Sequence, residues 1–174
     1  MAFDTYIRFE GGSPNIEGEA TAEGLKPATG WFEIFSFSWG ASNPTSVGTH
    51  SEGLSAGKVS VSTFNFVKKT DNASPLLFSA CCSGQHYGSA KVVMRKATGT
   101  SGKQATFLEY DFTNVMIESI NWGGTSGGDD TPTENISIAF AGVKIQYFKQ
   151  DTKTGSVSAG NIGSWDLTKA AASS

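Results

Sequence analysis

The feature that most constrains this chain is an alternation of apolar and polar side chains with a period of two residues, repeated in one stretch after another. Successive side chains of a β-strand point to opposite faces, so this period indicates strands with one buried face. It predicts strands at residues 3–10, 31–40, 58–68, 89–97, 104–121 and 133–149, with a short one at 19–24. Glycine fills 21 of 174 positions, as expected where many turns join many strands. We therefore expect one mainly β domain, closed or nearly closed, in antiparallel order.

One helix is predicted, at about residues 75–83. Ser74 suits the N-cap, Pro75 suits the first helical position, and Gly84 is a typical stop. The apolar residues of this stretch recur at helical spacing: Leu77, Ala80 and Cys81. This helix would flank the β-structure.

The stretch WFEIFSFSWG, residues 31–40, mixes aromatic residues with Ser36 and Ser38. Its odd positions are mostly aromatic, whereas its even positions become small and polar halfway along. With Ser60 and Ser62, these serines fit either an outer solvated face or a face that lines a shared cavity or pore, and alternation does not separate the two. The phase of the alternation also changes within 58–68 and at Gly142, where we expect a bulge or a bend.

Two segments lack this period. Residues 41–57 form a long extended loop with Pro44 and several glycines, and loops of this length are usually functional or disordered. The Gly/Ser/Ala-rich end of the chain, 151–174, contains an isolated Trp165, which predicts a docked segment before a frayed tail. We assign 1–168 to the domain and 169–174 to the tail.

Composition disfavours several classes of function. The net charge is −3 and no run of basic residues occurs, which argues against nucleic-acid binding. No stretch is apolar for the roughly 18 residues that a membrane helix needs, so no membrane insertion is expected. The N-terminal MAFDTYIRFE does not look like a secretory signal, so we expect cytoplasmic synthesis and export by another route. The adjacent Cys81 and Cys82 are not expected to form a structural disulfide.

No catalytic, cofactor-binding or metal-binding residues are predicted. His50 and His86 are isolated and lack the spacing of metal ligands, and no acid–base constellation is visible. We therefore predict no enzymatic activity and no cofactor. A stand-alone β-sandwich binding module, such as a lectin, remains an alternative, and Trp122, Asp129 and Asp130 are then the nearest candidates for its site.

Several strings, in this order and spacing, resemble the Hcp (hemolysin-coregulated protein) family, the tube proteins of the bacterial type VI secretion system. They are FSWG (37–40), AGKVSVSTFNFVKKTDNASPLLFSACCSGQHYGSAKVVMRKA (56–97), TENISIAFAGVKIQY (133–147) and WDL (165–167). The resemblance runs from about Ala2 to Thr168. It implies a two-sheet antiparallel β-barrel flanked by one α-helix.

The resemblance also implies a structural function. Family members form hexameric rings that stack into a hollow tube, inside a contractile sheath and behind a spike protein. The tube is secreted by the machine itself, and its lumen carries and stabilises effector proteins. A tube protein of another contractile injection machine, or of a phage-tail-like particle, is the runner-up.

Matching positions give the residues concerned. Ser38 would line the lumen, with Ser36 one pleat away, while the aromatic residues face the barrel core. The loop would reach the neighbouring ring through residues Asn43, Pro44, Val47, His50, Glu52 and Leu54. Phe37 stands where many relatives have Trp. Cys82 stands where relatives often have Ser, and we expect it to be partly exposed, so that its oxidation would crosslink subunits.

Overall fold

The computed structural model describes residues 3–47, 53–97, 103–128, 131–151 and 154–172. Its elements, in chain order, are β1 (Asp4–Glu10), β2 (Phe32–Ile34), β3 (Ser36–Ser38), β4 (Ala41–Ser42), β5 (Thr45–Val47), β6 (Leu54–Ala56), β7 (Ser60–Val61), β8 (Phe64–Lys69), α1 (Ser74–Ser83), β9 (His86–Ala97), β10 (Gln104–Gly123), β11 (Thr133–Gln150) and β12 (Val157–Asp166). The mainly β class and the helix near 75–83 are confirmed.

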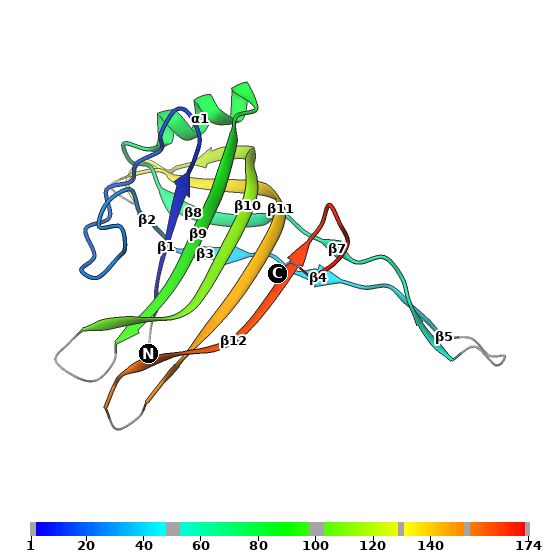
Figure 1. Ribbon diagram of the computed structural model, residues 1–174. Coiled ribbons are helices and arrows are strands. Elements are labelled where there is room, and N and C mark those ends of the chain that lie inside the picture. Colours follow the sequence, from blue (N-terminus) through cyan, green and yellow to red (C-terminus); the bar gives the residue numbers. More distant parts are fainter. Residues whose placement is uncertain (1–2, 48–52, 98–102, 129–130, 152–153, 173–174) are drawn as a thin grey trace.

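The main sheet closes on itself through one short segment of chain. Its strand order is β2-β1-β9-β10-β11-β8-β3, with β12 paired to β11, and every pairing is antiparallel. The two ends of this path, β2 and β3, are consecutive in sequence and are separated by Phe35 alone. The backbone N–H of Phe35 donates to the Val67 carbonyl oxygen at 2.8 Å, which joins this segment to β8. The expected barrel is therefore observed (Figure 1).

The prediction of one continuous strand at 31–40 was wrong at Phe35. The chain turns the corner of the barrel there and exchanges β1 for β8 as its partner. Phe35 and Ser36 both point outward, and Phe35 is 57% exposed. The core side chains before this corner are Phe32 and Ile34, and those packed against the core after it are Phe37 and Trp39. The predicted aromatic face is thus interrupted rather than continuous.

The prediction of one strand at 58–68 was wrong for a related reason. The segment contains β7, which pairs with β4 outside the barrel, and β8, which pairs with β3 and β11 inside it. Phe64 and Phe66 of β8 are buried in the core. The change of phase within this stretch therefore marks the point at which the chain enters the barrel.

The two longest strands, β10 and β11, are bent near Gly142 (Figure 1). Gly142 of β11 pairs with Thr113 of β10, and a Cβ atom at Gly142 would lie 2.7 Å from the Thr113 Oγ1. The next residue of β10, Asn114, has φ 51°, in the left-handed region. The predicted irregularity is therefore seen as the left-handed Asn114 beside Gly142 rather than as a shift of register, and glycine leaves room for the Thr113 side chain.

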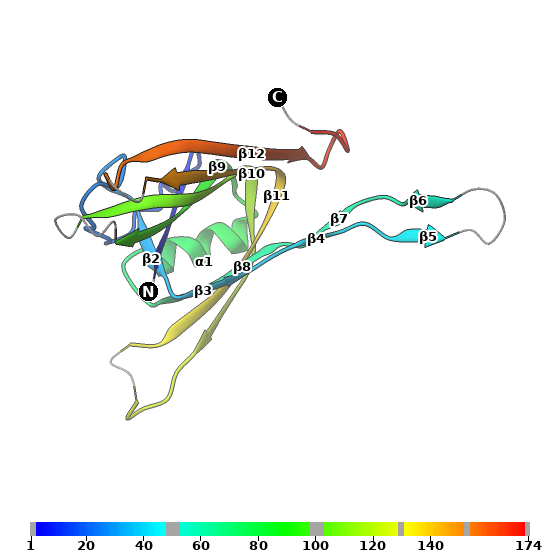
Figure 2. The ribbon, with the colours of Figure 1, turned by 90° about the horizontal axis from the view of Figure 1, so that it is seen from below.

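Helix α1 lies across one end of the barrel (Figures 1 and 2). Leu77 and Ala80 are fully buried in the core. The predicted N-cap was wrong, because the cap position is Ala73 and carries no side-chain cap. Instead, the Asp71 Oδ1 accepts from the Ala73 N–H at 2.9 Å, and the Ser74 hydroxyl accepts from the Asp71 N–H at 2.9 Å.

The predicted stop at Gly84 is confirmed and allows a test. Gly84 has φ 64°, and its N–H and that of Gln85 donate to carbonyl oxygens of the last helical turn. Gly84→Ala should lower the free energy of unfolding by about 1 kcal/mol, because a side chain is strained in this left-handed conformation. Gly40→Ala is the control, since a Cβ there meets nothing within 4 Å. Urea unfolding at fixed protein concentration would measure both, and equal effects would contradict this account.

The predicted strand at 19–24 does not form. Residues 11–31 instead cross the outer face of β1 and β9 as an irregular segment, with Gly24 in the left-handed region at φ 86°. A second, smaller core lies beneath this segment: Tyr6, Leu25, Trp31 and Val93. Neither neighbouring strand offers a free edge here, because β1 already pairs with both β2 and β9.

Candidate functional site: the polar wall, the arm and the open edge

Ser36 and Ser38 belong to an uncharged polar surface that crosses four strands. In antiparallel pairs, residues directly opposite each other lie on the same face. The register joins two such rows across β3, β8, β11 and β10: Ser38, Asn65, Ser137 and Ser119 in one, and Ser36, Val67, Asn135 and Asn121 in the other. We call these two rows the polar wall. All but Val67 carry a hydroxyl or an amide, and none is ionisable.

The polar wall faces away from the barrel core. Residues between its positions, such as Phe66 and Ile136, are buried, whereas Ser36, Ser38 and Asn135 are exposed. The Ser137 hydroxyl hydrogen-bonds to the Asn65 side chain within the wall. Alternation indicated the two serines, but the asparagines and serines of β8, β10 and β11 were missed, because strand order determines which residues adjoin them.

Ser60 and Ser62 do not belong to the polar wall, although the alternation grouped them with it. Ser60 pairs with Ser42, and the Ser62 hydroxyl accepts from the Gly40 N–H at 2.9 Å. Both serines are therefore at the root of a separate projecting hairpin, which is formed by β4 and β5 running out and β6 and β7 running back.

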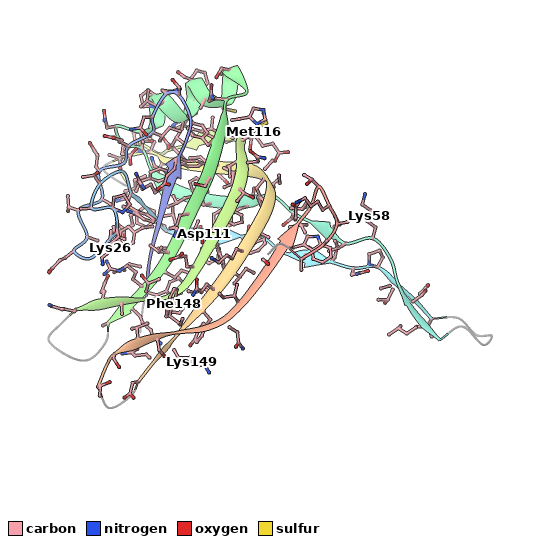
Figure 3. The ribbon with its side chains drawn as sticks, in the orientation of Figure 1. Lys26, Lys58, Asp111, Met116, Phe148 and Lys149 are labelled. Carbon is pink, nitrogen blue, oxygen red and sulfur yellow. The ribbon has the colours of Figure 1, made fainter. Side chains whose placement is uncertain are left out.

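This hairpin, which we call the arm, is the extended segment expected at 41–57, with two short paired sections that the sequence analysis did not predict. It projects from the barrel in both views (Figures 1 and 2). Its strands pair Ala41 with Val61 near the root and Val47 with Leu54 far from it. Figure 3 places Lys58 on the returning side, near the root. The sequence concealed these strands because serine and glycine weaken the apolar pattern.

The arm carries apolar side chains that its own barrel does not cover. Val47 is 76% exposed and Leu54 is 72% exposed, and the two lie directly opposite each other. Asn43 and Pro44 are also exposed. A two-stranded hairpin alone is at best marginally stable in water. Of the residues expected to contact a neighbour, His50 and Glu52 lie outside the described residues.

Strand β12 was missed by the sequence analysis and presents an open edge. It pairs with β11, and in the described part of the chain its other edge has no strand partner. Its Trp165 packs against the core, as the isolated tryptophan predicted. Ile162 and Val157 are exposed on this strand, and Tyr147 on the adjacent β11 is also exposed. An unpaired edge with apolar side chains is a typical place for another chain to pair.

The barrel core contains a buried ion pair near the start of α1. Lys68 is 1% exposed and Glu134 is 0% exposed, and their charged atoms lie 3.1 Å apart. The Lys68 ammonium also donates to the Asp71 Oδ1 at 2.7 Å, the Ser74 hydroxyl at 3.2 Å and the Lys69 carbonyl at 2.8 Å. This network connects β8 and β11 to the start of the helix.

Trp122, the sugar-binding candidate, is held by the same network. Its Nε1–H donates to the other Glu134 oxygen at 2.8 Å, and its ring lies 5.7 Å from that of Phe78, centroid to centroid. Trp122 is nevertheless half exposed. The two acids expected to join it, Asp129 and Asp130, lie outside the described residues.

A second charge cluster lies on the outer wall of the barrel. The Lys91 ammonium is 2.8 Å from Glu109 and 3.2 Å from Asp111, and Figure 3 shows Asp111 midway along β10. Burial lowers the pKa of Lys91, but the hydrogen bond to Glu109 and the two negative charges outweigh it, so the pKa is raised overall. The lysine therefore remains charged near neutral pH.

The structure provides no metal-binding arrangement among the residues it describes. No group of three or more His, Cys, Asp or Glu side chains is placed to hold an ion in those parts of the chain. His86 is exposed at the start of β9. Cys82 is exposed, as expected, whereas Cys81 is half-buried and burial raises the pKa of its thiol, with a smaller effect from Cys82. Within the same parts of the chain, no helix is long and apolar enough to cross a membrane.

Comparison with known proteins gives consistent similarities. A family model described as "Type VI secretion system effector, Hcp" matches residues 6–147. Protein hcp1 of Pseudomonas aeruginosa is 41% identical over 93 residues, which are 53% of this chain and only 56% of that relative. A solved structure of a type six secretion system protein has a TM-score of 0.86 at 30% identity, covering 99% of this chain and 100% of that one. Hcp1 from Salmonella typhimurium has a TM-score of 0.72 at 26% identity, with 97% of each chain covered.

Proposed function

Because this chain belongs to the Hcp family of type VI secretion proteins, we propose that it is a structural subunit of the secretion tube and not an enzyme. The subunits form hexameric rings, and the rings stack into a hollow tube. A contractile sheath surrounds the tube, a spike protein precedes it, and the tube is secreted by the machine. The observation that carries this proposal is the combination of an uncharged polar wall with two uncovered association surfaces in one subunit.

The polar wall is proposed to line the lumen. A channel that holds proteins of differing charge needs a surface that is wetted but does not attract one sign of charge strongly. Hydroxyl and amide side chains such as those of Ser36, Ser38 and Asn135 meet this requirement, since they exchange hydrogen bonds with water or cargo at little net gain. This supports a role in carrying and stabilising effector proteins.

The two association surfaces have different proposed roles. The open edge of β12, with the exposed side chain of Ile162, is proposed to meet the neighbouring subunit within the ring. The arm projects beyond the barrel and carries Val47 and Leu54, so it is proposed to reach the next ring. Burying these apolar side chains would contribute about 25 cal/mol per Å² of apolar area covered.

The direct test is the mass of the purified particle together with negative-stain images. Uniform six-membered rings, alone or in stacks, are the expected result. A strictly monomeric particle at high protein concentration would contradict the proposal. Tubes of another contractile machine would give the same images, so co-purification with sheath and spike proteins of the type VI system would complete the assignment.

The lumen assignment leads to a separate prediction. Ser38→Gln places a larger side chain on the exposed polar wall and should leave ring size and stability unchanged, because Ser38 is exposed and its neighbours are polar. Retention of a co-expressed effector should fall severalfold, because the larger side chain would project into the lumen and obstruct contact between the effector and the polar wall. Pull-down of tagged rings would measure it.

Ser79→Gln is the matched control, since Ser79 is exposed on α1 at the end of the barrel. It should retain cargo like the unmodified protein. If Ser38→Gln retained cargo equally well, Ser38 would not lie at the cargo surface.

A further inference from the structure

A cavity beside β9 contains a buried arginine whose donors are largely unused. Arg95 is 3% exposed, and its Nε and Nη1 atoms are buried and have no hydrogen-bond partner. Its Nη2 atom donates to the Gln104 carbonyl oxygen at 3.0 Å. In the described part of the chain Arg95 forms no ion pair, although Asp4 is its cross-strand neighbour and hydrogen-bonds to the Gln104 amide.

Unpaired donors of this kind call for an explanation. A buried guanidinium that lacks an anion or a full set of acceptors is unfavourable, and such groups in proteins usually meet a partner. The chain's other arginine, Arg8, pairs with Glu10 and is partly exposed. Of the two arginines, Arg95 is therefore the one with buried donors that lack acceptors.

The cavity has the size and lining of a small-molecule site. Its volume is about 570 Å³, and Tyr6, Glu23, Gly24, Lys103 and Gln104 line it together with Arg95. Small-molecule sites commonly have volumes of 300–1,000 Å³. The irregular segment at 11–31 forms one side of the cavity through Glu23 and Gly24. Figure 3 labels Lys26 in the same segment. A Cβ atom at Gly24 would lie only 2.9 Å from the Arg95 Nη2, so glycine allows this segment to approach the guanidinium closely.

The charges of the lining indicate the class of ligand. Arg95 and Lys103 supply positive charge, and the Tyr6 hydroxyl and Gln104 amide add polar groups. Glu23 lines the same cavity, and Asp4 lies on the next strand. A doubly charged anion would be repelled by these acids, whereas a singly charged, planar carboxylate matches the guanidinium with less repulsion. We propose that this cavity binds a carboxylate group through Arg95.

The arginines allow a direct test by NMR on the protein. With only Arg8 and Arg95 in the sequence, the spectrum contains two Nε–H signals, and Arg95→Lys assigns them by removing one. Sodium acetate and sodium propionate, which are both singly charged, should shift the Arg95 signal to saturation and leave the Arg8 signal in place. Sodium chloride at matched ionic strength should produce no saturable shift, and inorganic phosphate should bind more weakly than acetate. Tighter binding of phosphate would overturn the carboxylate assignment.

Two variants test the site itself. Arg95→Lys should weaken acetate binding about tenfold or more in calorimetry, because a compact ammonium does not reproduce the guanidinium donors. Lys103→Gln changes an exposed residue and should fold normally while weakening binding by about threefold, the effect of one partly screened charge. Arg8→Lys is the matched control and should bind normally. Unchanged binding in both Arg95→Lys and Lys103→Gln would overturn the proposal.

The carboxylate can come from a free acid or from a neighbouring copy of the chain, and the second source rests on the proposed self-assembly. Particle mass separates them. A free ligand would bind with the mass unchanged. Competition with a neighbour's carboxylate would instead lower the particle mass on addition of acetate, and Arg95→Lys would assemble poorly. The NMR arm does not depend on the assembly. Absence of both the Arg95 shift and any change in mass overturns the carboxylate site and leaves the tube proposal intact.

Discussion

Lys68→Met is expected to lower the free energy of unfolding by about 3–5 kcal/mol, because it leaves an uncompensated buried carboxylate in the barrel core. Glu134 is fully buried, and Lys68 lies 3.1 Å from it. Methionine replaces the aliphatic part of lysine but offers no charge. Urea unfolding at fixed protein concentration, followed by circular dichroism, measures the change.

A double-mutant cycle separates the pair from its surroundings. Glu134→Leu alone should be less damaging than Lys68→Met, because the Lys68 ammonium keeps Asp71 as a charged partner. The double variant Lys68→Met/Glu134→Leu should recover much of the loss, since apolar residues of similar volume often replace a buried pair at little cost. If the two single effects simply added in the double variant, the pair would not be coupled.

The matched control lies on the outer wall. Lys91 also contacts two acids, Glu109 and Asp111, but all three are partly exposed. Lys91→Met should cost no more than about 1 kcal/mol, because partly exposed ion pairs contribute little. A loss as large as that of Lys68→Met would show that burial is not the reason for the difference.

The sequence predicted the barrel well where strands carry strong alternation. Strand β8 and the first part of β11 bury large apolar side chains at every second position, for example Phe64 and Phe66 in β8 and Ile136 and Ile138 in β11, and this pattern is local. The helix end was also predictable, because Gly84 adopts a conformation that other residues rarely do. In both cases the determining interaction lies within a few residues of the chain.

The failures occurred where a distant partner decides the structure. β12 forms because the free edge of β11 offers backbone hydrogen bonds, although its own sequence is rich in Ser and Gly. The corner at Phe35 lies where the chain changes its pairing partner: β2, before Phe35, pairs with β1, and β3, after it, pairs with β8. Likewise, Ser36 and Ser38 were identifiable as a polar face, but the rest of the polar wall depends on strand order, which alternation does not specify.

The arm provides the second large expected effect. Val47→Asp combined with Leu54→Asp should abolish stacking of rings, with a reduction in tube length of at least tenfold, while single rings persist. The two side chains face each other and are highly exposed, so they contribute little to the fold of their own subunit. Two carboxylates placed directly opposite would repel each other and would resist burial against a neighbour. Tube length distributions from negative-stain images measure the effect.

Asn72→Asp is the control, because it adds a charge at an exposed position of the barrel, outside the arm. It should shorten tubes far less than the double variant does. If both variants stacked like the unmodified protein, Val47 and Leu54 would not form the contact between rings. If the double variant instead failed to form rings, Val47 and Leu54 would lie at the contact between subunits of one ring. The proposal that the arm connects successive rings would then be wrong.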